Sequence, residues 1–175
     1  MGSIIKVNEY KDFNNNAIMT SDGAGVVTPN ASGIKNTPAF ALRKSGDQTI
    51  STGANTLITW DVAQIDTASG FDNSADSYTI PAGQGGTYFC TLAVGWSSDS
   101  RVILSIEKNG AAVVASDGED GNNLAFQNFS CILNLSAGDV LKTYYYMVSS
   151  GGPIREKNNS GQYVTRFEGF KLIGA

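Results

Sequence analysis

Three acidic residues in one short stretch are the best candidates for chemistry in this 175-residue chain. Asp117, Glu119 and Asp120 lie in the Gly/Asn-rich segment Ser116–Asn123. A glycosidase pair needs one carboxyl group with a raised pKa, and nothing obvious in such a segment would raise one. Carboxylate oxygens also bind Ca²⁺, but the spacing does not match an EF-hand loop. We interpret the segment as an exposed acidic turn and keep the three residues as weak metal candidates.

Other common catalytic groups are absent from the sequence. The chain contains no histidine, which removes the commonest general base and the commonest zinc ligand. Triads and dyads in their usual form are therefore excluded. The 20 glycines form neither a P-loop nor a dinucleotide-binding fingerprint. The sequence predicts a protein that is not an enzyme and that carries no cofactor.

Charge and hydrophobicity limit the partners. A net charge of −4 and a pI near 4.7 argue against nucleic acid, because phosphate binding needs a basic patch. No run of 18 apolar residues exists, so we expect no membrane insertion. The start, Met1–Glu9, lacks the pattern of a secretory signal. Cys90 and Cys131 each fall in an apolar strand, and we expect free buried thiols made in a reducing cytosol.

Hydrophobicity alternates with a period of two along most of the chain, and Gly, Asn, Asp and Ser interrupt it. This pattern predicts an all-β, antiparallel two-sheet sandwich or jelly roll. Lys108–Gly110 predicts a tight hairpin, because Asn-Gly tolerates positive φ. The expected strands are Ala39–Leu42, Leu57–Val62, Tyr78–Ile80, Thr87–Trp96, Val102–Glu107, Ala111–Ala115, Asn128–Leu135, Val140–Val148 and Tyr163–Ile173.

Several strands carry apolar or small residues on both faces. In Thr87–Trp96 one face, from Tyr88 to Trp96, is large and apolar, and the other is small. The small face suits close approach by a loop of the same chain or by a neighbouring subunit. The closing strand and the tyrosines 144–146 also place apolar or aromatic side chains on both faces. For the tyrosines, packing against a neighbouring strand is the alternative to contact with another subunit. The predicted trimer interface is Phe89, Thr91, Ala93, Gly95, Tyr145, Phe167 and Gly169.

Residues 1–36 differ from the rest, because they are polar and hold too few large apolar residues for a core. Two short strands, Ala17–Thr20 and Gly25–Thr28, are expected to flank a Ser-Asp-Gly turn. We interpret the segment as an extended docking arm, and a flexible leader is the alternative. The arm resembles the β-hairpin leaders of bacteriophage virion proteins. Its candidate docking residues are Ile5, Val7, Tyr10, Phe13, Ile18, Met19, Val26 and Val27.

Residues 37–175 contain several short motifs in a fixed order, and they are Thr37–Phe40, Asp47–Ile50, the aromatic pair Phe71 and Tyr78, Gly86–Tyr88, Lys108–Gly110 and Phe167–Leu172. In these motifs the segment resembles the jelly-roll head of tumour-necrosis-factor ligands and of complement component q. Cys90 replaces the family's usual phenylalanine, and no collagen-like stalk precedes the head. The resemblance implies a homotrimer that binds and does not catalyse, and some such trimers carry calcium near the apex.

These inferences together predict a non-enzymatic bacteriophage virion protein. We expect a trimer, made in the host cytoplasm and displayed on the virion surface, that decorates or cements the capsid through its arm. Its partners would be other copies of the chain and the major capsid protein or another virion protein. A tail-fibre tip that binds a host surface receptor is the alternative. A secreted binding module of the complement-head type is a second alternative.

Overall fold

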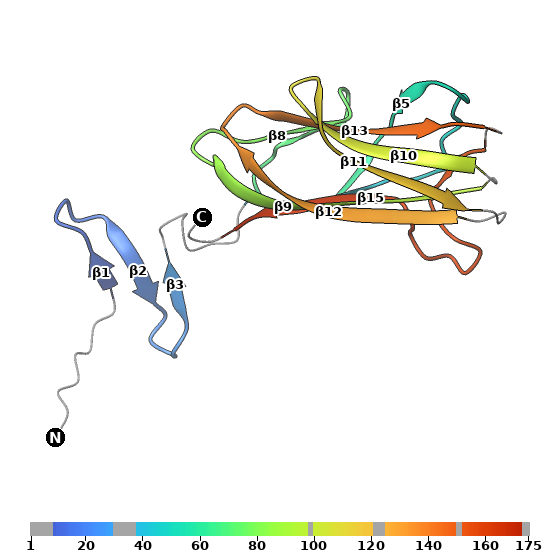
Figure 1. Cartoon of the computed structure of the whole chain (residues 1–175). Coiled ribbons are helices and arrows are strands. Elements are labelled where there is room, and N and C mark those ends of the chain that lie inside the picture. The colour runs from blue at the N-terminus through green and yellow to red at the C-terminus, as the bar shows by residue number, and fades with distance from the viewer. Residues whose placement is uncertain (1–8, 30–37, 98–99, 121–124, 150–151, 173–175) are drawn as a thin grey trace.

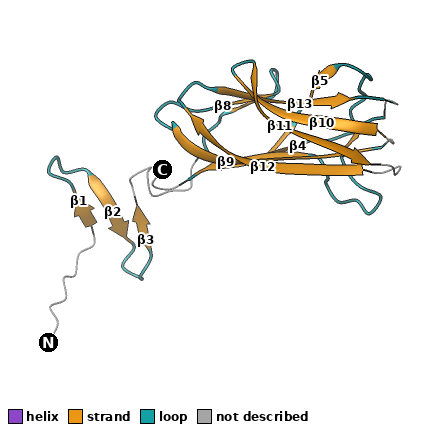
Figure 2. Cartoon of the chain, in the orientation of Figure 1, coloured by secondary structure: helices purple, strands orange, loops and turns teal. Residues whose placement is uncertain are grey.

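A computed structural model of the chain describes residues 9–29, 38–97, 100–120, 125–149 and 152–172. Every regular element in these ranges is a β-strand (Figures 1 and 2). The strands are β1 Glu9–Lys11, β2 Ala17–Ser21, β3 Val27–Pro29, β4 Ala39–Arg43, β5 Asn55–Leu57, β6 Val62–Asp66, β7 Phe71–Asp72, β8 Ser77–Thr79, β9 Gly86–Trp96, β10 Ser100–Lys108, β11 Ala111–Asp120, β12 Ala125–Leu135, β13 Val140–Met147, β14 Ile154–Arg155 and β15 Arg166–Lys171.

Two antiparallel sheets pack face to face as a sandwich (Figure 1). The first sheet has the order β12-β9-β15-β4-β6, and β14 also pairs with β9. The second has the order β11-β10-β13-β8-β7, and β5 also pairs with β13. Many neighbouring strands are distant in sequence, as a jelly roll requires. The predicted all-β, two-sheet antiparallel fold is confirmed.

The core lies between the two sheets and follows the alternation of the sequence. In β9 the five predicted core residues are buried, namely Tyr88, Cys90, Leu92, Val94 and Trp96. Residues of β10 and β13 face them from the second sheet, and they include Leu104 and Tyr145. The aromatic ring of Phe40 stacks on Tyr78 with ring centroids 4.0 Å apart. The predicted core face of β9 is confirmed.

The expected strand Leu57–Val62 is wrong, because the chain crosses there from one sheet to the other. β5 ends at Leu57 beside β13, and β6 begins at Val62 beside β4. Ile58 and Trp60 lie between these strands and are buried. The Trp60 indole N–H donates to the hydroxyl of Thr143 at 3.0 Å. Alternation therefore marks the buried residues but misses that the segment spans the core.

Residues 9–29 form a separate three-stranded sheet in the order β1-β2-β3. Asp12 closes the first turn by accepting hydrogen bonds from the backbone amides of Asn14 and Asn16. The predicted strands in residues 17–20 and 25–28 correspond to β2 and β3, and β1 was not predicted. None of the described side chains in residues 9–29 is fully buried. The expected boundary between residues 36 and 37 lies outside the described residues.

The sandwich has two distinct ends along its strands. At one end Lys171 donates its backbone amide to Pro38 at 3.0 Å, and Leu172 donates to Thr87 at 2.8 Å. We call this the arm end, because Pro38 is the first described residue after the arm. At the other end Ile154 pairs with Trp96. We call this the far end, and Figure 1 shows the two ends on opposite sides of the sandwich.

Candidate functional site

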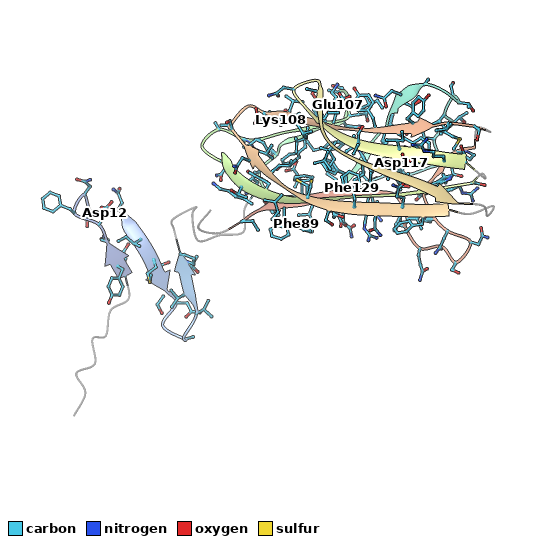
Figure 3. The ribbon with its side chains drawn as sticks, viewed as in Figure 1. Asp12, Phe89, Glu107, Lys108, Asp117 and Phe129 are labelled. Atoms are coloured by element: carbon cyan, nitrogen blue, oxygen red, sulfur yellow. The ribbon has the colours of Figure 1, made fainter. Side chains whose placement is uncertain are left out.

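The described part of the acidic segment, residues 116–120, belongs to a strand rather than to the expected turn. β11 continues to Asp120, and Asp117 lies beside Arg101 on β10 (Figure 3). The guanidinium of Arg101 donates to Asp117, with 2.8 Å between Nε and Oδ1, and this hydrogen bond lowers the pKa of the carboxyl group. Asp117 is therefore ionised and paired at neutral pH. Glu119 pairs in register with Arg101, and the side chains of Glu119 and Asp120 fall outside the description.

The described residues contain no cluster of three or more metal-ligating side chains. Within the same residues no helix is long and apolar enough to cross a membrane.

The outer face of the first sheet carries a row of large apolar side chains. Ile132 on β12 pairs in register with Phe89 on β9, and Phe89 pairs with Phe170 on β15. The rings of Phe89 and Phe170 lie 5.5 Å apart between centroids. The Ile132 side chain is 65% exposed, and Ile65 on β6 is 48% exposed. Figure 3 shows Phe89 on the side of the sheet away from the core.

A shallow hollow of about 250 Å³ lies within this row. Ala39, Ala41 and Thr91 line it together with Ile65 and the two phenylalanines, and the acidic residue Glu168 also lines it, beside Ala41 and Thr91. We call this surface the apolar patch, defined as Ile65, Phe89, Ile132 and Phe170 with Ala39, Ala41 and Thr91. Small side chains and Glu168, which pairs with Arg166, separate the large apolar ones.

Two of the predicted interface residues, Phe89 and Thr91, lie on the apolar patch. Ala93 and Gly95 share that face but are already covered within the chain, and Ala93 is only 1% exposed. The backbone amide of Gly95 donates to the hydroxyl of Thr165 at 3.2 Å. Part of the small face is therefore explained by a loop of the same chain, which was one of the two expectations.

The other three predicted interface residues face the core, which corrects the prediction. Tyr145 is 0% exposed and Phe167 is 1% exposed, so neither side chain has surface left for another subunit. A Cβ atom on Gly169 would lie 2.7 Å from the Phe40 ring. Alternation separates the two faces of the closing strand but does not say which one is inward. Phe170 is the outward aromatic residue.

Ile65, Ile132 and Phe170 are therefore the patch residues that were not predicted as interface. Ile132 follows Cys131, which was expected to point inward, so alternation alone could have placed Ile132 outside. Ile65 had no such signal, because no strand was expected there.

The described part of the arm, residues 9–29, presents most of its large apolar side chains to solvent. Tyr10, Phe13, Ile18, Val26 and Val27 are exposed. Met19 is half-buried. The predicted docking residues Ile5 and Val7 lie outside the described residues.

Cys90 and Cys131 are direct cross-strand neighbours in β9 and β12. Both thiols are free, as predicted. Burial raises the pKa of Cys90 to about 12, and the nearby Cys131 adds to the effect. Burial also raises the pKa of Cys131, which is only half-buried. The pair therefore consists of neutral thiols that fill space in the core.

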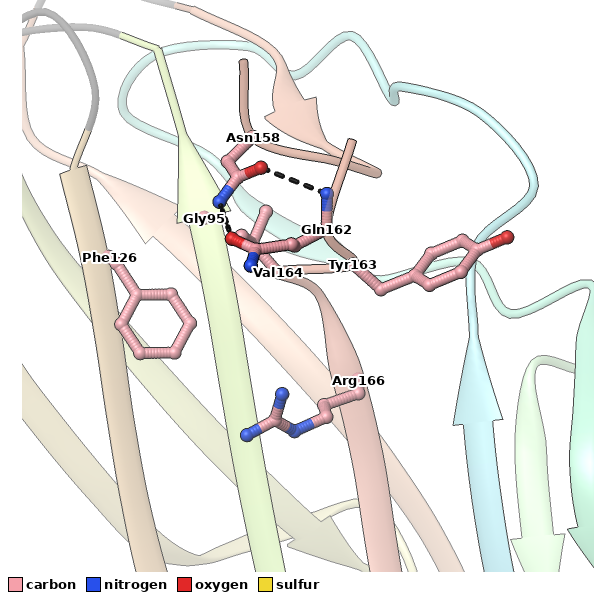
Figure 4. A pocket seen from close by; sticks show the side chains of 7 residues that line it. All are labelled: Gly95, Phe126, Asn158, Gln162, Tyr163, Val164 and Arg166. Carbon is pink, nitrogen blue, oxygen red and sulfur yellow. Dashed lines mark hydrogen bonds between the residues drawn. The ribbon is translucent and has the colours of Figure 1, made fainter. Parts of the chain in front are cut away.

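A second and larger hollow opens at the far end, on the same face of the first sheet (Figure 4). Its volume is about 480 Å³. The seven lining residues come from β9, β12, β15 and the loop before β15, and they are Gly95, Phe126, Asn158, Gln162, Tyr163, Val164 and Arg166. We call this the far-end pocket. Sequence reasoning missed it, because its loop has no motif.

Hydrogen bonds within the loop fix the shape of the far-end pocket. The Asn158 carboxamide donates to the Gln162 carboxamide at 2.7 Å and accepts from the Gln162 backbone amide at 2.9 Å (Figure 4). The ring of Tyr163 is held by two cations, since Arg43 lies 4.2 Å and Lys157 4.7 Å from its centroid. These contacts hold the loop in place beside the pocket.

The comparisons with known proteins show a similarity at the level of the fold. No family model matches the sequence, and no curated protein matches it. Among solved structures, the sandwich is similar to the globular domain of zebrafish complement 1qA, with a TM-score of 0.57 and 14% sequence identity. The match covers 77% of this chain and 97% of that one. The predicted jelly roll of the tumour-necrosis-factor and complement-head type is confirmed at the level of fold.

Proposed function

We propose that this chain is a non-enzymatic bacteriophage virion protein, a homotrimer that decorates or cements the capsid through its N-terminal arm. The observation that carries the proposal is the apolar patch, with its exposed Ile65 and Ile132 on the outer face of the first sheet. Large apolar side chains grouped on the exposed face of a folded domain, with a polar residue such as Glu168 beside them, are typical of a binding interface.

A second copy of the same chain is the occupant we propose for the apolar patch. The patch lies on strand interiors, where side chains are held in register and a flat partner surface fits. Ala39, Ala41 and Thr91 leave room for close approach of another strand. The resemblance to complement heads, which form trimers, favours closure around a threefold axis over an open chain of contacts.

The arm supports docking to a larger assembly. A three-stranded sheet without a buried side chain in residues 9–29 gains little stability from hydrophobic burial. Its exposed Tyr10, Phe13 and Val26 would gain that burial against a partner. We propose the major capsid protein or another virion protein as this partner, because the sequence of the arm resembles phage virion leaders.

A binding role also agrees with the chemistry of the described residues. The chain has no histidine, and the ion pair with Arg101 holds Asp117 in its charged form. Complement-type heads are generally binding modules rather than enzymes.

One alternative has a specific observation in its favour. The similarity to a zebrafish complement head fits a secreted binding module equally well. A tail-fibre tip is the other alternative, and it shares the trimer but places it at a different part of the virion.

Electron microscopy of purified particles labelled with an antibody to this chain separates the three possibilities. We expect label distributed over the capsid. Label confined to the tail tip would replace the decoration role with receptor binding. Particles without label, together with the protein in the extracellular fluid, would contradict the virion proposal and favour the secreted module.

A further inference from the structure

We propose that the far-end pocket binds an acidic saccharide, meaning a sugar ring that carries a carboxylate. This proposal goes beyond the virion role, and it needs neither the trimer nor the arm. It rests on the shape, the aromatic wall, the amide donors and the charge of the pocket.

The size of the far-end pocket suits a small ligand. Its volume of about 480 Å³ falls in the range of about 300–1,000 Å³ that is typical of small-molecule sites. Gly95 forms part of its lining and adds no side chain, so a ligand can lie close to the backbone of β9 (Figure 4). The pocket is open on one side, which fits a ring attached to a longer glycan.

The aromatic wall is Phe126, which stands near the start of β12 and is 46% exposed. Its ring borders the pocket in Figure 4. The C–H groups on one face of a sugar ring are weakly apolar and pack well on an aromatic face. A sugar would therefore cover an exposed phenylalanine without requiring a fully apolar ligand.

The amide donors come from the loop before β15. Asn158 holds the Gln162 side chain by its oxygen, so the carboxamide is fixed before a ligand arrives. Among the described residues no hydrogen bond uses Nε2 of Gln162, which leaves its two donors for ligand hydroxyls. Fixed donors lose little entropy on binding.

The charge of the pocket points to a carboxylate. Arg166 is the only cation among the described lining residues, and none of them is acidic, in a chain of net charge −4. Nε of Arg166 lies 3.4 Å from Oε2 of Glu168, which steadies the guanidinium. In Figure 4 the guanidinium lies over β9 beside the pocket. Its two terminal nitrogens match the two oxygens of a carboxylate.

The far-end pocket lies away from the arm end along β15. Arg166 pairs with Ala93 near the far end, whereas Lys171 pairs with Tyr88 near the arm end. The two pairs are five residues apart, which corresponds to about 17 Å along β15.

Ligand-observed saturation-transfer NMR on the full chain tests the proposal, with glucuronate as the probe. Glucose serves as the uncharged sugar and acetate as the carboxylate without a ring. We expect glucuronate to bind about tenfold more tightly than either, with saturation strongest on its ring C–H protons. Equal binding of acetate and glucuronate, or no binding of glucuronate at millimolar concentration, would overturn the proposal.

Two variants locate the site, and a third controls for charge. Phe126→Ala and Arg166→Gln should each weaken glucuronate binding about tenfold, and Arg166→Gln should bring glucuronate to the level of glucose. Lys171→Gln removes the same charge from the same strand at the arm end and should bind like the wild type. Circular dichroism verifies that each variant is folded. If folded Arg166→Gln retained wild-type affinity, the assignment of the carboxylate to this pocket would be wrong.

Discussion

At the residue scale, the glycine of the closing strand has a clear physical role. Gly169 lies against the ring of Phe40. A Cβ atom at this position would also lie 3.1 Å from the backbone oxygen of Phe89. Any side chain there would displace either an aromatic core residue or the neighbouring strand. The glycine between two phenylalanines therefore reflects packing inside the sandwich rather than contact with another subunit.

Gly169→Ala should lower the free energy of unfolding by about 1–3 kcal/mol, the usual cost of overpacking a core. Gly46→Ala is the matched control, because no atom lies within 4 Å of its Cβ position and its φ is not positive. Urea unfolding of both variants measures the difference. Equal stability of the two variants would show that Phe40 moves aside without cost.

The buried thiol of Cys90 should make stability fall at alkaline pH. Its pKa is about 12 in the folded protein, against about 9 when unfolded, so the unfolded chain loses this proton first. The contribution is complete below pH 9 and is lost as the pH rises from 9 toward 12. Between pH 8 and 10 this one thiol should cost the wild type about 1.4 kcal/mol.

Cys90→Ala should lose less stability over the same pH interval, although it starts from a lower value because of the missing sulfur. The interval ends at pH 10 because tyrosines in the unfolded chain lose their protons near and above that pH. Burial raises the pKa of Tyr88 to about 12 in the folded protein, so this tyrosine would also lower the stability at higher pH. Urea unfolding at pH 8 and pH 10 provides the measurement. An identical loss in both proteins would indicate that Cys90 is exposed to solvent.

The sequence predicted which face of β9 is buried, but it did not predict which face of the closing strand points inward. Alternation in β9 identified Tyr88 to Trp96 as core, since a strand interior has a strict period of two. The same rule left Phe167 and Phe170 equivalent, because both are aromatic. Only the register with Leu92 and Phe89 decides which of them faces inward.

At the element scale, the errors come from contacts between distant segments. The stretch 57–62 alternates like a strand, yet Trp60 is bonded to Thr143 across the core. The acidic segment looks like a turn, yet it completes β11 because β10 offers hydrogen-bonding partners along its length. The far-end pocket combines Phe126 of β12 with Asn158, which comes more than 30 residues later in the chain, and no local pattern encodes such a meeting.

The arm should be separable from the sandwich. Deletion of residues 1–36 removes none of the described core residues, so we expect a folded protein with nearly unchanged stability. The truncated chain should fail to bind particles, since the exposed residues Tyr10 to Val27 would be missing. Circular dichroism and co-sedimentation with particles stripped of this protein measure the two outcomes. An insoluble truncated chain, or one that binds as well as the full chain, would contradict the arm's role.

At the scale of the whole molecule, the inner face of the first sheet is covered by the core, and its outer face exposes the apolar patch. The core explains why the chain folds, and the apolar patch explains why we propose that it assembles. The patch could be predicted only in part, because Phe89 and Thr91 were identified and Ile65 and Ile132 were not. The proposal of a trimer rests on the resemblance and on the exposed patch.

Sedimentation equilibrium of the full chain at micromolar concentration tests this central claim most directly. We predict a mass about three times the 18.4 kDa of one chain. Ile132→Glu should shift the protein toward the monomer without unfolding it, because the side chain is 65% exposed in one chain but would place an unpaired charge in the contact. Val148→Glu, at an exposed valine that lies outside the patch, should remain a trimer. A wild type that sediments as a monomer, or an Ile132→Glu variant that stays trimeric, would contradict the account.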